Sequence, residues 1–239
     1  MKPRTRATII FLLCLSCVLT GALADSETAL TLFRYTHGGY VVPQTYEIAL
    51  LEDGYSLTEN DGDPQPIDAV VVEEIMQIIE DYDVRAWDGF HESDPYVLDG
   101  EGFSLEIGFS DGASVDASGD NAFPTGYHGA INGIEAVLER VRMERIAGTY
   151  RYEGEGLGGD FTITLNADGT YSFTEGLLSS YAGGGTWYAD VYGVYLDEKN
   201  GADIHLMFAF EADALVFLEA YADNFPGVKV PHEGRFVRE

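Results

Sequence analysis

The sequence predicts an α+β domain, with an antiparallel sheet and two helices, followed by an all-β barrel of about eight strands. Two observations carry this prediction. Up to residue 146, strand-like stretches alternate with two stretches of helical period, whereas no helical period follows. Beyond that point, turn signals separate eight short strand candidates, a spacing typical of a sandwich or small barrel. We therefore place the domains at residues 25–146 and 147–239.

The first 24 residues have the pattern of a secretory signal peptide. They carry three bases and no acid, and the apolar run Ala7–Leu19 leads to the small-x-small site Ala22-Leu23-Ala24. That run is too short for a membrane span. We expect cleavage after Ala24 and a secreted or envelope-associated mature chain without a transmembrane segment. The alternative is a lipoprotein anchored at Cys17.

The mature chain is strongly acidic. All 41 acidic residues follow the signal peptide, and only 10 of the 13 bases do. Nucleic acid is excluded as a partner because its phosphates require clustered Lys and Arg. Both cysteines, Cys14 and Cys17, lie in the signal peptide, so the mature chain has neither a disulfide nor a thiolate site.

Five stretches of the first domain are expected to form strands because they are rich in β-branched and aromatic residues or alternate between apolar and polar side chains. These are Leu30–Thr36, Thr45–Leu51, Tyr55–Thr58, Phe103–Phe109 and Ser114–Ala117. Glu52-Asp53-Gly54 and Asp111-Gly112 are hairpin turn signals. Strict alternation in the fourth stretch predicts that its four apolar side chains face the core.

Two helices are expected, each with one apolar stripe. The first begins near Pro66, a residue that the first helical turn tolerates, and its stripe is Ile67, Val71, Ile75, Ile78, Ile79 and Tyr82. The stripe of the second is Ile131, Ile134, Val137, Leu138 and Val141. Asn132 and Glu135 have the spacing of a capping box, so this helix begins either at Asn132 or near Thr125.

The second domain contains eight strand candidates joined by turns such as Asn166-Ala167-Asp168-Gly169. They are Gly148–Tyr152, Phe161–Leu165, Thr170–Thr174, Gly185–Tyr188, Gly193–Leu196, Ile204–Phe210, Leu215–Ala220 and Gly234–Val237. Eight up-and-down strands close a barrel whose interior is either filled by side chains or holds one small ligand.

This second domain resembles the small lipocalin-like barrels attached to bacterial envelope proteins. The resemblance is carried by Gly148-Thr149-Tyr150, by Leu165-Asn166-Ala167-Asp168-Gly169-Thr170-Tyr171 at the first hairpin, and by Gly185-Thr186-Trp187. It covers about two-fifths of the chain and implies a lipocalin-like barrel.

Residues 30–146 are similar to an uncharacterised module of secreted and surface proteins from Gram-positive anaerobes. The similarity is carried by Trp87-Asp88-Gly89-Phe90, by the stretch from Val97 to Leu105 and by the stretch from Ala117 to Pro124. It implies a location and an architecture, and no activity.

Metal and catalytic motifs give little support to an enzyme. The five histidines never pair at a metal-binding spacing, and no Gly-x-Ser-x-Gly elbow occurs. Glu59-Asn60-Asp61-Gly62-Asp63 is the densest group of oxygen ligands, but it lacks the ligand ladder of a calcium loop. We therefore expect no cofactor, with calcium binding left open. A hydrolase with a carboxylate pair assembled by the fold is an alternative.

Two aromatic loops flank the predicted helices. Trp87, Asp88, Phe90 and His91 follow the first helix, and Asn121 and Phe123 precede the second. Exposed aromatic side chains on loops act as anchors for partners, so these six residues form a candidate recognition patch. The structural interpretation is that Trp87 and Phe123 close the end of the core while Asp and Asn fix the turns.

Four of the ten mature bases lie within twelve residues. Arg140, Arg142, Arg145 and Arg151 either complement the dipole at the C-terminus of the second helix or dock one acidic domain on the other, and we favour the second interpretation.

These features predict a secreted or cell-envelope binding protein without enzymatic activity, whose ligand is a partner protein or a surface glycan. The alternatives are a carrier that holds a small apolar ligand inside the barrel and the hydrolase described above. Large side chains at the inward positions, among them Tyr171, Trp187, Phe208 and Phe217, would exclude a ligand from the barrel.

Overall fold

A computed structural model describes residues 28–39, 43–97, 100–154, 161–175, 182–198, 205–218 and 230–239. The predicted signal peptide, its cleavage site and Cys17 lie outside the described residues. No helix of the described chain combines the length and the apolar character that a membrane span requires.

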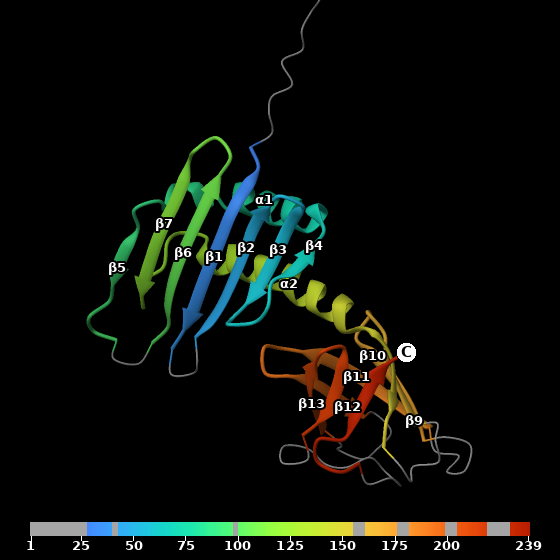
Figure 1. Cartoon of the computed structure of the whole chain (residues 1–239). Helices are drawn as coiled ribbons and strands as arrows, with labels where there is room; N and C mark the ends of the chain where they lie inside the picture. The colour runs from blue at the N-terminus through green and yellow to red at the C-terminus, as the bar shows by residue number, and fades with distance from the viewer. Residues whose placement is uncertain are drawn as a thin grey trace, which may run out of the picture.

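The first half of the chain forms a seven-stranded sheet in the order β4-β3-β2-β1-β6-β7-β5 (Figure 1). The strands are β1 (Leu30–Gly38), β2 (Gln44–Leu51), β3 (Gly54–Glu59), β4 (Gln65–Ile67), β5 (His91–Ser93), β6 (Gly102–Phe109) and β7 (Ser114–Asp120). All five predicted strands of this half are present. β4 and β5 are additional, and β5 pairs parallel to β7, so the sheet is mixed.

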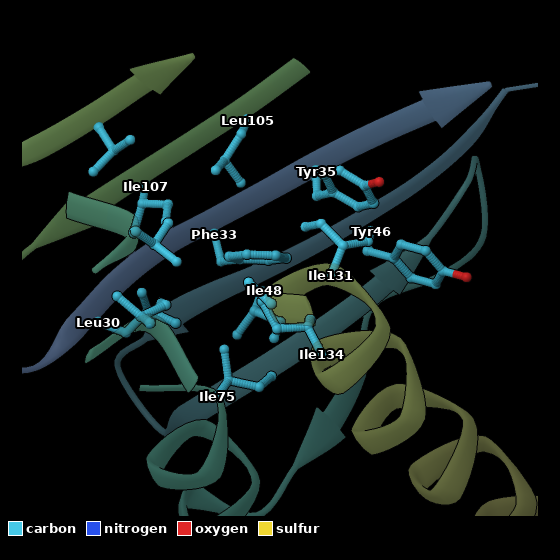
Figure 2. Close-up of a cluster of buried hydrophobic side chains, with 14 of the residues drawn as sticks. Leu30, Phe33, Tyr35, Tyr46, Ile48, Ile75, Leu105, Ile107, Ile131 and Ile134 are labelled. Carbon is cyan, nitrogen blue, oxygen red and sulfur yellow. The ribbon is translucent and has the colours of Figure 1, made fainter. Parts of the chain in front are cut away.

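Helices α1 (Ala69–Asp81) and α2 (Tyr127–Ile146) cover one face of this sheet, with the 3-10 helix η1 (Val84–Trp87) following α1 (Figure 1). Apolar side chains of alternate strand residues meet the helix stripes there, and Phe33, Ile48, Ile75 and Ile107 are fully buried (Figure 2). On the opposite face, Arg34 pairs with Glu47 of β2 and Glu106 of β6, at 2.8 and 2.7 Å.

The first helix begins later than predicted. Pro66 lies in the edge strand β4, where a missing N–H is tolerated, and not in a helical turn. Asp68 is the N-cap residue, and its Oδ1 atom accepts a hydrogen bond from the Val70 N–H at 3.0 Å. A capping side chain therefore defines this start, and the proline two residues earlier pairs with Ser56 of β3 in the sheet.

The second helix begins near Thr125, and the alternative start at Asn132 is wrong. Gly126 is the N-cap residue with φ +82°, a conformation that glycine adopts without strain, and the Tyr127 N–H donates to the Pro124 carbonyl at 3.1 Å. Asn132 and Glu135 therefore lie inside the helix. Glu135 instead reaches towards β1, with Oε1 3.3 Å from His37 Nε2.

The second half forms a closed barrel in the order β10-β11-β12-β13-β14-β15-β8-β9, with every pairing antiparallel. Its strands are β8 (Gly148–Tyr152), β9 (Phe161–Leu165), β10 (Thr170–Glu175), β11 (Ala182–Ala189), β12 (Val194–Glu198), β13 (His205–Glu211), β14 (Ala214–Phe217) and β15 (Arg235–Arg238). The predicted fold class, an α+β part followed by an eight-stranded barrel, is confirmed.

Helix α2 contributes to both hydrophobic cores. Its first turns bury Ile131 and Ile134 against the sheet, whereas Ile146 at its end belongs to the buried cluster of the barrel, with Met143 packed beside it. The Tyr150 hydroxyl donates to the Ile146 carbonyl, which ties the helix end to β8. The sheet and the barrel are therefore joined by a shared helix rather than by a free linker.

Candidate functional site

One hollow runs along α1. It has a volume of about 780 Å³ and lies between this helix and the start of β1, closed by residues of β3, η1 and the β6–β7 turn. We call it the α1 groove. Its lining residues are Thr28, Ala29, Leu30, Tyr55, Ala69, Val72, Glu73, Met76, Gln77, Glu80, Arg85 and Asp111.

Two stripes on α1 explain the groove. Val71, Ile75 and Ile79 repeat at helical spacing and are buried in the core between the helices and the sheet. A second stripe, Ala69, Val72, Glu73, Met76, Gln77 and Glu80, repeats with the same period on the neighbouring side of the helix. Val72 of the second stripe is also buried, but the rest of that stripe is exposed or half-buried and becomes one wall of the groove.

The floor of the groove is apolar and its rim is acidic. Leu30 and Val72 are almost fully buried, and Tyr55 and Met76 are half-buried. The exposed carboxylates of Glu73, Glu80 and Asp111 form the rim of the groove around these apolar residues. A site of this kind binds a ligand that is apolar on one side and polar on the other.

Arg85 is the basic residue that lines the groove, and it is already engaged. Its guanidinium lies over the Phe109 ring, 3.6 Å from the centroid, and its Nε atom is 3.3 Å from Glu80 Oε1. The cation–π contact holds Arg85 against the protein, and its charge offsets part of that of Glu80. Glu73 and Asp111 keep an unopposed negative charge within the described lining.

Three residues of the predicted recognition patch are brought together. Trp87, Phe90 and Phe123 line one hollow of about 430 Å³, beside Tyr82. Trp87 itself is only 4% exposed, and its indole N–H donates to the Thr125 carbonyl at 3.1 Å. Phe123 packs on Tyr127, with ring centroids 4.7 Å apart. Trp87 and Phe123 therefore close the end of the core and leave a shallow aromatic surface outside it.

The three polar residues of the patch do not line this hollow and are engaged in hydrogen bonds with neighbouring residues. Asp88 Oδ1 accepts from the Asp116 N–H at 3.0 Å, which caps the edge of β7. Exposed His91 shares a 2.9 Å hydrogen bond with Ser118 Oγ. Asn121, at φ +55°, donates from Nδ2 to Asp120 Oδ1 at 3.1 Å.

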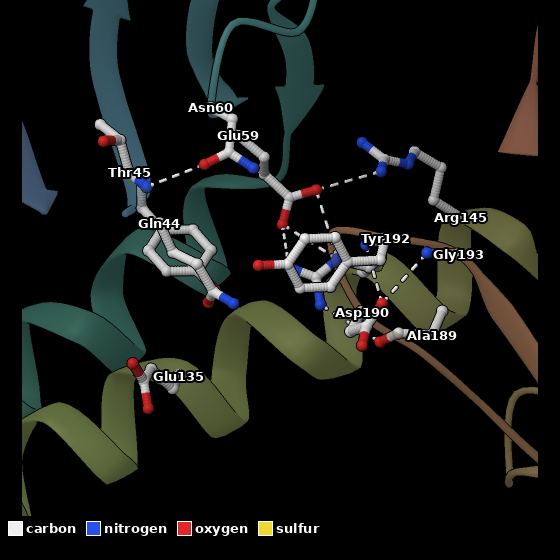
Figure 3. A network of polar contacts seen from close by, with 12 residues as sticks. Gln44, Thr45, Glu59, Asn60, Glu135, Arg145, Ala189, Asp190, Tyr192 and Gly193 are labelled. Carbon is white, nitrogen blue, oxygen red and sulfur yellow. Dashed lines mark hydrogen bonds and ion pairs between the residues drawn. The ribbon is translucent and has the colours of Figure 1, made fainter. Parts of the chain in front are cut away.

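A second polar arrangement lies at the seam between the sheet and the barrel (Figure 3). Arg142 Nε donates to Glu59 Oε1 at 3.0 Å, and Arg142 Nη1 donates to the Ala189 carbonyl of the barrel at 3.2 Å. Arg145 Nη2 reaches the other oxygen of Glu59 at 3.2 Å. Hollows of about 320 and 460 Å³ flank this network and share Glu59, Arg145 and Phe210.

The four arginines therefore serve different contacts, and the docking interpretation holds for only part of them. Arg142 joins the two halves, as the docking interpretation predicts, whereas the Arg145 side chain pairs with Glu59 inside the first half. Arg140 pairs with Glu74 of α1 and with Glu144, at 3.5 Å for the latter, and Arg151 pairs with Glu239.

One half-buried carboxylate has a perturbed pKa. Burial raises the pKa of Glu135 above its ordinary value, nearby His37 lowers it, and Glu101 raises it. The surrounding tyrosines are buried as well, and the hydroxyl oxygens of Tyr35 and Tyr127 are 2.8 Å apart. None of the four hollows described above is lined by Glu135.

Two residues of the candidate calcium cluster, Glu59 and Asn60, are already engaged in other hydrogen bonds. Glu59 accepts hydrogen bonds from two arginines, and Asn60 Oδ1 accepts from the Thr45 N–H at 3.0 Å. Throughout the described ranges, no three His, Asp or Glu side chains gather as a metal ion would require.

The inward face of the barrel is aromatic. Phe161 and Phe236 pack edge to face with centroids 5.0 Å apart, and Phe208 lies 5.5 Å from Phe217. Trp187 is 2% exposed and donates from its indole N–H to the Asn166 carbonyl at 2.8 Å. The inward positions named in the sequence analysis are thus all buried within the wall and its core.

The α1 groove is a feature that the sequence analysis missed. Its signal is the pair Val72 and Met76 beside the stripe Val71, Ile75 and Ile79, which makes the apolar arc of α1 wider than one contact with the sheet requires. Comparison of the chain with protein-family models, with curated proteins and with solved structures finds no significant match.

Proposed function

We propose that this protein is an exported binding protein of the cell envelope that holds a segment of a partner protein in the α1 groove and performs no chemistry on it. The single observation that carries the proposal is the groove itself, a hollow of about 780 Å³ with an apolar floor and a polar rim. Hollows of this size and composition are typical binding sites.

A partner protein is favoured over a surface glycan by the floor of the groove. Half-buried Met76 offers aliphatic surface above the buried side chains of Leu30 and Val72, and such a floor matches apolar side chains and not sugar hydroxyls. The aromatic ring of Tyr55 is also present, but its hydroxyl already donates to the Leu30 carbonyl at 3.0 Å.

The barrel gives less support to a carrier. Its inward side chains pack ring against ring, as Phe208 does against Phe217 and Phe236. A filled barrel serves as a stable scaffold rather than as a ligand cavity.

A hydrolase would need two carboxylates with opposed environments in one cleft. Glu135 is the carboxylate whose pKa burial raises, and it lies beside His37, away from the four hollows. This arrangement favours binding over catalysis.

Blocking the groove tests the proposal. Ala69 is an exposed residue of its wall, and neighbouring Val70 is 50% exposed without lining the groove. We expect Nile red, a neutral apolar fluorophore, to bind the wild type and Val70→Trp alike, and Ala69→Trp at least five-fold more weakly because the indole fills the hollow. Gln77→Trp, at a second exposed wall position, serves if Ala69→Trp misfolds by circular dichroism. Equal binding by all variants would refute the proposal.

A further inference from the structure

We propose that the segment held in the α1 groove is a cationic amphipathic helix of the partner polypeptide. This identification rests on the proposed function and adds the charge and the shape of the ligand. It is carried by the length of the groove, by its apolar floor and by the sign of its rim.

The shape of the groove fits a helix. Its wall on α1 extends from Ala69 to Glu80, three turns that span about 17 Å. The opposite wall is formed by Thr28–Leu30 together with Tyr55, so the hollow lies along the helix axis and not at its end. A partner helix of three turns lays its apolar face into such a groove with residues spaced three and four apart.

The floor of the groove supplies the apolar contacts. Val72 and Met76 are four residues apart on α1, and Leu30 and Tyr55 face them from the sheet. Leu30 and Val72 are almost fully buried, so the apolar surface offered to a partner is mainly that of Tyr55 and Met76. Burying a partner's Leu or Ile side chain against it releases apolar surface from water, which is the main favourable contribution to such complexes.

The rim selects the charge of the partner. Glu73, Glu80 and Asp111 line the rim. The positive charge in the lining is that of Arg85, whose guanidinium already lies on the Phe109 ring and near Glu80. Within the described chain, Glu73 makes no ion pair. Lys or Arg side chains that flank the apolar face of a bound helix would meet these carboxylates.

The charge of the whole molecule acts in the same direction. Residues 25–146 contain 26 acidic residues and five basic ones. A field of this sign attracts cationic segments over distances of about one Debye length and repels acidic ones. An acidic or neutral helix would leave the rim carboxylates without counter-charges.

The experiment uses the mature full-length chain and an 18-residue helical peptide made of Leu on one face and Lys on the other. Isothermal titration calorimetry should show binding at 50 mM NaCl and at least ten-fold weaker binding at 300 mM, because salt screens the rim. Replacing Lys by Glu in the peptide should abolish binding. Replacing Leu by Ser should weaken it at least ten-fold, because the apolar contacts are lost.

Protein variants locate the site. Glu73→Gln should weaken peptide binding by about two- to five-fold, the effect of one surface ion pair. Glu92→Gln removes the same charge from exposed β5, outside the groove lining, and should have no comparable effect. Ala69→Trp should weaken binding at least five-fold, whereas Val70→Trp should not.

Four results would overturn the inference. They are equal binding of the Lys and Glu peptides, equal binding of the Ser peptide, equal effects of Glu73→Gln and Glu92→Gln, and equally tight binding of the small cationic amphiphile dodecyltrimethylammonium. Loss of Nile red binding in Ala69→Trp would still support a binding groove in each case, so failure of the inference is distinguishable from failure of the proposed function.

Discussion

Arg142 joins the sheet and the barrel through buried contacts. Its side chain is 7% exposed and that of Glu59 is 14% exposed, so their charges interact with little screening by water. Arg142 also donates to the Ala189 carbonyl at 3.2 Å. Removing one partner of such a pair costs far more than removing a surface ion pair, because the other is left desolvated.

We therefore expect Arg142→Met to lower the free energy of unfolding by about 2–4 kcal/mol, less than a fully buried pair because Arg145 still reaches Glu59. Arg140→Met on the same helix is the control. Its ion pairs with Glu74 and Glu144 are roughly half-exposed, and their loss should cost less than about 1 kcal/mol. Urea unfolding measures both variants, and equal losses would contradict the role assigned to Arg142.

Helix α2 carries two glycines whose surroundings differ. A Cβ atom at Gly133 would lie 3.4 Å from Ile78 Cδ1, which is ordinary packing against α1. At Gly129 it would lie 2.3 Å from Tyr82 Cε1, so the tyrosine would have to move. Glycine is thus needed for the close approach of Tyr82 at one position, whereas the other position accepts alanine.

Replacing each glycine by alanine tests this difference. We expect Gly133→Ala to raise the free energy of unfolding by about 0.5–1 kcal/mol, because alanine loses less backbone entropy in a helix. Gly129→Ala should raise the free energy of unfolding by less, because the Tyr82 side chain must move to make room for the new Cβ atom. Thermal unfolding of the two variants measures this difference. An equal gain in stability in both would show that the Tyr82 side chain moves without a cost in free energy.

Negative charge dominates the whole molecule, with a formal net charge of −28 at pH 7 including the predicted signal peptide. Carboxylates repel one another in the compact state, and partial protonation relieves this repulsion. Glu135 adds a specific contribution. Because burial raises its pKa in the folded state, the folded chain binds this proton more readily than the unfolded chain, so stability falls as the pH rises from the ordinary value through the raised one.

We accordingly expect the unfolding temperature to rise when the pH is lowered from 7 to 5. In Glu135→Gln the slope over this range should be shallower, because the titrating group is absent. Differential scanning calorimetry at half-unit pH steps measures the slope, with Glu139→Gln on the same helix as the control. A wild-type slope in Glu135→Gln would show that Glu135 does not contribute.

Much of the fold was predictable from local patterns in the sequence. Alternation along Phe103–Phe109 predicts one buried face, and Phe103, Leu105, Ile107 and Phe109 are all 5% exposed or less. The turn glycines Gly112 and Gly169 have positive φ values of 86° and 79°, as their hairpin positions require. Such features depend on period and on turn chemistry, which neighbouring residues determine.

The candidate site and the seam were decided only by the tertiary structure. The α1 groove forms because the core covers one stripe of α1 fully and the next only in part, and Glu59 meets Arg142 across 83 positions of sequence. The three-residue strands β4 and β5 exist through their partners β3 and β7, because segments this short have no period of their own. Local patterns determine which residues of an element are buried, whereas contacts between distant segments depend on how whole elements pack.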